Sequence, residues 1–153
     1  MLDSPWVRLA AILFTVFVLV PLFWCFVVWL LSRASGWGRL ARRYESNRRF
    51  EGKTSRWQSA RVGFIHYNRV LTFTQMDDGL GLTPMPLFSA GHPPLFIPWK
   101  AISYGGKKRS YFVAMDAFWM GEVKPVEFLT APGIINLEHL EAEAPLSARE
   151  RSR

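Results

Sequence analysis

A long hydrophobic run separates the start of the chain from everything that follows. Ala10–Leu31 contains no charged side chain over 22 positions. A helix of this length spans about 33 Å, close to the ~30 Å hydrocarbon core of a bilayer. A soluble amphipathic helix shows a polar face, and this run has none. The pattern therefore predicts a transmembrane helix at residues 10–31, preceded by a short N-terminal segment at residues 1–9.

The run also fits two other interpretations. One is a core helix buried in a soluble domain. The other is a cleaved signal peptide, for which Ser32-Arg33-Ala34 weakly resembles a cleavage site. The run is longer than the usual apolar core of a signal peptide, and basic residues are not concentrated before it. Within the helix we expect Pro21 to cause a kink, because it removes one backbone hydrogen bond.

The next segment, residues 32–53, is basic and amphipathic. Its apolar side chains recur at helical spacing, at Trp37, Leu40, Ala41 and Tyr44. Arg39, Arg42 and Arg43 fall mainly off this stripe, and Ser35 is a candidate cap. Either the stripe packs on the following domain, or it enters the lipid interface while the arginines bind headgroups. We favour packing on the domain as its main role.

From Thr54 onward the pattern has the period of two that is typical of strands. It places Val62, Phe64 and His66 on one face of a strand. A turn at Asn68 leads to a second strand, Val70–Met76. Asp77-Asp78-Gly79 is a strong turn signal, after which Leu80 and Leu82 begin the next strand.

Shorter strands follow in the second half of the domain. The expected strands are Leu95–Trp99, Ala101–Tyr104, Ser110–Met115 and Val123–Leu129. Pro98 and Pro125 suggest that their strands lie at sheet edges. Gly105–Arg109 has the composition of a hairpin loop.

The strand pattern ends at Pro132-Gly133. Asn136 is a candidate N-cap for a short helix, Leu137–Ala144, with His139 on its solvated side. Residues 145–153 have the composition of a disordered tail. The fold class is therefore α+β. One N-terminal transmembrane helix precedes a mainly antiparallel β domain of six or seven strands at residues 54–144, which is closed by a short C-terminal helix.

The net charge of +7 is concentrated beside the hydrophobic run. Residues 33–61 contain nine Lys or Arg and two Glu, whereas opposite charges balance in the segments before and after. This distribution argues against a protein that coats nucleic acid. Arg8 is the only basic residue before the run, and the basic residues after it are many. The positive-inside rule therefore predicts an N-terminus outside and a C-terminal domain in the cytoplasm.

Few residues offer chemistry. The chain has one Cys and three His, and no metal-ligand spacing joins them. His92 is followed by Pro93-Pro94, which stiffen its loop, so this loop either presents a binding residue or is a turn in which the histidine caps a carbonyl. No nucleophile elbow or phosphate loop is found. We therefore expect no catalytic activity, no metal and no cofactor.

The order of elements resembles the pleckstrin-homology-like (PH-like) superfold, including its GRAM branch, over residues 57–144. Ile97–Ile102, preceded by Gly79–Leu82, looks like a strand boundary common in such domains. More specifically, Ser35–Tyr44 and Gly91–Trp99 resemble segments of a family of small, uncharacterised bacterial single-pass membrane proteins. The resemblance implies a PH-like barrel or roll and a place in the bacterial inner membrane. It implies no activity, and the basic hairpin of phosphoinositide-binding members is not found here.

These observations predict a membrane-anchored, non-catalytic interaction or scaffold module. Its expected partners are the lipid bilayer and a protein, with no nucleic acid. The candidate contact residues are Trp37, Arg39, Arg42, Arg43, His92, Pro93 and Pro94. Two alternatives are an anionic-lipid-sensing surface on the basic segment and an enzyme with an unrecognised site.

Overall fold

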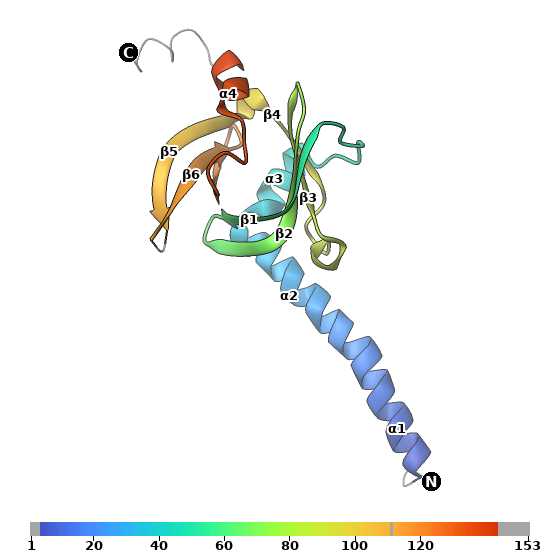
Figure 1. Cartoon of the computed structure of the whole chain (residues 1–153). Coiled ribbons are helices and arrows are strands. Elements are labelled where there is room, and N and C mark those ends of the chain that lie inside the picture. Colours follow the sequence, from blue (N-terminus) through green and yellow to red (C-terminus); the bar gives the residue numbers. More distant parts are fainter. Residues whose placement is uncertain (1–3, 111, 144–153) are drawn as a thin grey trace.

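A long N-terminal helical rod leads into a β domain in the computed structural model, which describes residues 4–110 and 112–143 (Figure 1). The rod comprises α1 (Pro5–Phe14), the π-helical turn η1 (Thr15–Leu19) and α2 (Val20–Ser35). Ser4 caps it by accepting a hydrogen bond from the backbone N–H of Val7 at 3.3 Å. The π-helical turn ends two residues before Pro21, whose missing N–H disturbs regular α-helical bonding.

Gly36 ends the rod and lets the chain change direction. Its φ of 90° lies in the left-handed region, where a glycine is favoured. A Cβ at this position would lie 3.1 Å from the Val126 side chain, which leaves no room for a larger residue. The helix that follows, α3 (Trp37–Tyr44), therefore lies against the domain. Trp37 and Leu40 are buried, and Ala41 and Tyr44 pack against the core, as the stripe predicts.

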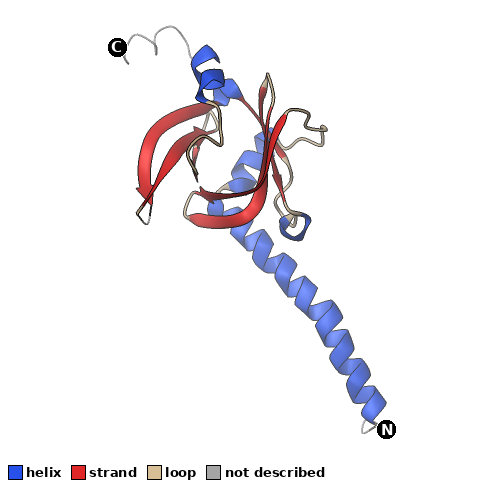
Figure 2. Ribbon diagram, in the orientation of Figure 1, coloured by secondary structure: helices blue, strands red, loops and turns tan. Residues whose placement is uncertain are grey.

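The domain is one antiparallel sheet of seven strands, in the order β4-β3-β2-β1-β7-β6-β5. Figure 2 shows the strands, in red, as strongly curved arrows. The strands are β1 (Lys53–Val62), β2 (Ile65–Gln75), β3 (Gly79–Pro84), β4 (Leu95–Pro98), β5 (Ile102–Ser110), β6 (Val113–Met120) and β7 (Val126–Thr130). Two 3-10 turns, η2 (Pro86–Phe88) and η3 (Trp99–Ala101), follow β3 and β4. The α+β class, the antiparallel sheet and the short C-terminal helix predicted from the sequence are confirmed.

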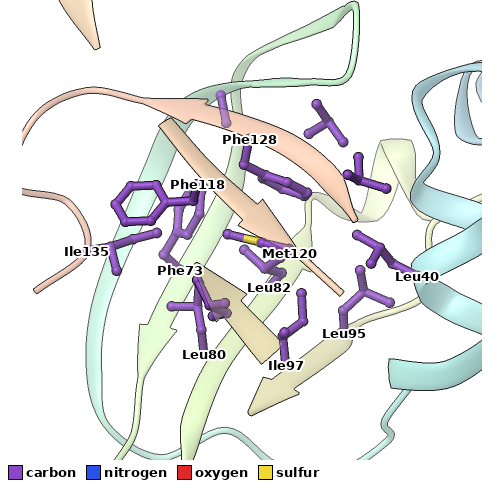
Figure 3. Packing of buried hydrophobic residues seen from close by; sticks show 14 of the residues in the cluster. Leu40, Phe73, Leu80, Leu82, Leu95, Ile97, Phe118, Met120, Phe128 and Ile135 are labelled. Atoms are coloured by element: carbon purple, nitrogen blue, oxygen red, sulfur yellow. The ribbon is translucent and has the colours of Figure 1, made fainter. Parts of the chain in front are cut away.

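The sheet curls around a single apolar core. Buried side chains from β2, β3, β4, β6 and β7 meet there, together with Leu40 from α3 (Figure 3). The C-terminal helix α4 (Leu137–Glu143) packs on η3 and β5. Asn136 caps it, because its side-chain oxygen accepts from the N–H of Glu138 at 3.1 Å. Ala144 and the predicted tail at 145–153 lie outside the described residues.

Three details of the sequence interpretation are wrong around the turns. Gly105–Arg109 belongs to β5, which runs without a break through the two glycines and has a register shift between Tyr104 and Lys107. The first hairpin turns at Gly63-Phe64 rather than at Asn68, so Val62 is buried whereas Phe64 and His66 are exposed. In the first hairpin the position of the turn decides which side chains are buried, because a shift of one residue in the pairing register moves every later side chain to the other face.

Two further expectations need correction. Pro98 does lie in an edge strand, but β7 is central, between β1 and β6. Pro125 is tolerated because it precedes the first residue of β7 and does not join the ladder. His139 is not fully solvated, since its ring stacks on Trp99 with centroids 5.1 Å apart.

Candidate functional site

One face of α2 is buried although the rest of the rod is exposed. Val28, Ser32 and Ser35 are at most 2% exposed, and they recur at intervals of four and three residues. Trp24, one turn before Val28, lies on the same face. The C-terminal part of the apolar helix is therefore docked on the domain along one stripe. We call this contact the helix–domain junction.

The connection between β3 and β4 lies along this stripe. Its Gly91 carbonyl accepts a hydrogen bond from the Ser32 hydroxyl, and its Leu87 carbonyl accepts from the indole N–H of Trp24 at 3.0 Å. The rings of Trp24 and Phe88 meet edge to face at 5.5 Å. Gly91 lies so close to the helix that a Cβ would be 3.2 Å from the Cα of Trp29.

A polar network occupies the centre of the junction. The Tyr67 hydroxyl is hydrogen-bonded to Ser35 Oγ at 3.0 Å and to His92 Nε2 at 2.7 Å. The carbonyl of Ala90 lies 3.2 Å from His92 Nδ1 and accepts its proton. The Tyr67 hydroxyl has a single proton, which it donates either to Ser35 Oγ or to His92 Nε2. This network links β2, the β3–β4 connection and the C-terminal end of α2.

Burial determines the ionisation of this network. Desolvation lowers the pKa of His92, and the hydrogen bond to Ala90 opposes this effect. Desolvation likewise raises the pKa of Tyr67, against the effect of its bond to Ser35. The imidazole and the phenol are therefore both neutral near pH 7, as suits hydrogen bonds in a buried structural contact.

The predicted contact residues fall into two groups. Trp37 and His92 are 0% exposed, so neither side chain can touch lipid or a partner in this conformation. The two rings pack together at 5.4 Å, and the Trp37 indole donates to the Pro93 carbonyl at 3.1 Å. The Pro94 carbonyl accepts from the N–H of Ser46 at 3.0 Å. The His92–Pro94 loop thus belongs to the junction rather than to an open surface.

The second group is the basic face of α3. Arg39, Arg42 and Arg43 are exposed. Arg43 forms an ion pair of 2.8 Å with Glu122, in the turn between β6 and β7. Arg39 and Arg42 line a shallow depression with Val123 and Lys124 from the same turn. This group is the part of the predicted site that faces outward.

Sequence reasoning missed the other half of the junction. Tyr67, Ser32 and Val28 were not singled out, although two serines three residues apart at the end of an apolar run indicate a hydrogen-bonding face. Within residues 4–110 and 112–143, no group of three or more His, Cys, Asp or Glu is placed to hold a metal ion.

The arrangement is thus an apolar N-terminal helix locked onto a curled β domain, with a basic helix beside the junction. Comparison of the chain with family models, curated proteins and solved structures found no match.

Proposed function

We propose that this protein is a single-pass membrane protein whose β domain is a non-catalytic interaction module held against the lipid surface. The observation that carries the proposal is the helix–domain junction. The Pro5–Ser35 helix is long and apolar enough to cross a bilayer by length and composition. Its last turns are bonded to the domain through Ser35 with Tyr67 and through Ser32 with the Gly91 carbonyl, so helix and domain form one unit.

The junction also favours a retained anchor over a cleaved signal sequence. Cleavage near Ala34 would remove Val28 and Ser32, both of which are buried against the domain. It would also leave Gly91 without the helix that it packs on. A signal sequence that is discarded has no reason to supply buried residues to the mature fold.

The membrane we propose is the bacterial inner membrane, with the N-terminus outside and the domain in the cytoplasm. The charge distribution supports this orientation, because six arginines lie between Arg33 and Arg49 and only Arg8 precedes the helix. The strand order, with a four-stranded meander, three further strands and a closing helix, supports the PH-like assignment.

The surface offered to a partner is the basic face of α3. It lies directly after the membrane helix, and Arg39 and Arg42 make no ion pair with a described residue. An acidic protein segment is the complementary ligand. Anionic lipid headgroups are the second candidate, because each arginine near an anionic leaflet contributes about 1 kcal/mol of attraction.

Topology and retention of the helix are tested together. Alkaline phosphatase and a fluorescent protein are fused in turn to the C-terminus of the full chain, and the intact mass of the membrane-bound chain is measured. The proposal requires an inactive phosphatase, a fluorescent reporter and an uncleaved chain. An active phosphatase or a chain that begins near residue 35 contradicts it.

A photo-crosslinking residue at Arg42 tests the partner surface, with the same residue at the exposed Lys100 on η3 as the matched control. A protein adduct at position 42 that is lost in Arg39→Glu, and is absent at position 100, supports the protein ligand. A phospholipid adduct with the same dependence supports the lipid ligand. Equal adducts at both positions contradict a role for the basic face.

A further inference from the structure

The connection between β3 and β4 is unusually apolar for a surface loop. No charged residue lies between Asp78 and Lys100. The loop begins with Met85-Pro86-Leu87-Phe88, where Leu87 is 60% exposed. Connecting segments on a soluble surface are normally polar. This loop instead presents a leucine at its tip, beside a helix that is itself exposed and apolar.

The loop tip reaches well along the apolar helix. Trp24, which contacts Leu87 and Phe88, lies eleven residues before Ser35 at the domain end of the helix. At 1.5 Å per residue this is about 16 Å. Figure 1 shows the loop descending beside α2, on the side of the domain toward the N-terminus of the chain.

The length of the helix places this tip relative to a bilayer. The 31 residues of Pro5–Ser35 span about 46 Å, roughly 16 Å more than a hydrocarbon core. If the core begins at Pro5, its other boundary falls at Trp24. If it covers Ala10–Leu31 instead, Trp24 lies about 10 Å inside it. Both placements put the tip of the loop in contact with lipid.

Internal hydrogen bonding makes the loop suitable for that environment. The N–H groups of Phe88, Ser89 and His92 donate to the carbonyls of Met85, Pro86 and Ser89, at 2.8, 3.1 and 3.0 Å. The Ser89 hydroxyl also donates to Pro86, and Trp24 satisfies the Leu87 carbonyl. Backbone groups that enter an apolar phase must be satisfied in this way. Trp29, under the Arg33 guanidinium at 4.6 Å, supplies an aromatic and basic pair typical of the interface.

We infer that the Met85–Phe88 loop is a second membrane contact, which inserts Leu87 into the same leaflet through which the helix leaves the bilayer. The inference rests on the proposed membrane anchor and goes beyond it. A helix alone leaves the rigid unit of helix and domain free to tilt and to rotate about the helix axis in the bilayer. A helix and an inserted loop together fix the side of the domain that faces the lipid, and so the direction in which the basic face of α3 points.

The test uses depth-dependent quenching of a fluorophore in the full chain, reconstituted in nanodiscs. Cys25→Ala removes the native thiol, and single cysteines are introduced by Phe17→Cys, Leu87→Cys, Ser89→Cys or Lys100→Cys. Nanodiscs with nitroxides at shallow or deep acyl positions quench the label according to its depth. Urea midpoints of the labelled variants check that the domain is folded, and Ser89→Cys gives a second loop position if Leu87→Cys is unstable.

The expected result is strong quenching of Phe17→Cys by the deep nitroxide and of Leu87→Cys by the shallow one. Lys100→Cys should keep its intensity in both lipids, and Ser89→Cys should fall between. If Phe17→Cys is quenched and the two loop positions behave like Lys100→Cys, the loop insertion is wrong and the anchor stands. If Phe17→Cys is not quenched, the anchor itself is wrong, and the loop insertion with it.

Discussion

Removing one hydroxyl tests whether the buried network really holds the helix–domain junction together. In Tyr67→Phe the ring keeps its packing against Trp37 and loses hydrogen bonds of 2.7 Å to His92 and 3.0 Å to Ser35. Neutral hydrogen bonds contribute about 0.5–1.5 kcal/mol each, and leaving a buried acceptor unpaired costs about 1–3 kcal/mol. His92 is fully buried, so Nε2 has no water to replace the phenol. We expect the free energy of unfolding to fall by about 2 kcal/mol.

The assay is urea unfolding of the full chain in nanodiscs, followed by tryptophan fluorescence. Tyr104→Phe is the matched control, because the Tyr104 hydroxyl donates to Asp116 at the long distance of 3.3 Å and its residue is 40% exposed. The control should change stability by less than about 0.5 kcal/mol, as is usual for a surface substitution. Equal effects of the two variants would refute the network as a structural element of the junction.

Three other predictions use the same assay. Trp37→Ala should lower the free energy of unfolding by about 3–5 kcal/mol, because the side chain is fully buried in the core; a loss below that of the exposed-site variant Trp57→Ala would contradict this. The unfolded chain takes up a proton at His92 near pH 6.5, whereas its pKa in the folded state is lower. The free energy of unfolding should therefore be level above about pH 7 and fall as the pH drops below 6.5. His92→Gln should remove part of this dependence on pH. An unchanged dependence would argue against the burial of His92 as its cause. Gly91→Ala should cost about 1–2 kcal/mol from its φ of 70° alone, and more because the new Cβ would meet Trp29 at 3.0 Å. The control is Gly106→Ala, where φ is 86° but no atom lies within 4 Å of the new Cβ. An equal loss of stability in the two variants would show that the contact of Gly91 with the helix contributes nothing.

The parts of the fold that the sequence predicts are those with a strong local period. The apolar run, the stripe from Trp37 to Tyr44 and the cap at Asn136 each depend on residues close together in the chain. The interpretation of Gly105–Arg109 failed because two glycines and three basic residues have the composition of a turn. Here Gly105 instead makes room for the indole of Trp119 on the neighbouring strand, at 3.0 Å from its ideal Cβ position. That requirement comes from cross-strand pairing, which composition does not record.

The candidate site likewise has one part that the local sequence pattern predicts and one part that it does not. The exposed arginines of α3 follow from the helical period, which separates them from the buried stripe. The burial of His92 cannot be predicted in this way, because the side chains that it contacts, Tyr67 and Trp37, lie 25 and 55 residues away in the chain. A histidine before two prolines suits an exposed loop as well as a buried one. Packing against Trp37 of α3 and Tyr67 of β2 keeps this one away from solvent.

The most direct test of the account is the distance between the membrane helix and the domain. Nitroxides are placed at Phe17→Cys and Lys100→Cys in the Cys25→Ala chain, and their separation is measured in nanodiscs by double electron–electron resonance. A single narrow distribution is predicted, which should broaden when a flexible glycine linker is inserted after Gly36. A broad distribution in the chain without the linker would contradict the claim that the helix and the β domain are one rigid unit at the membrane.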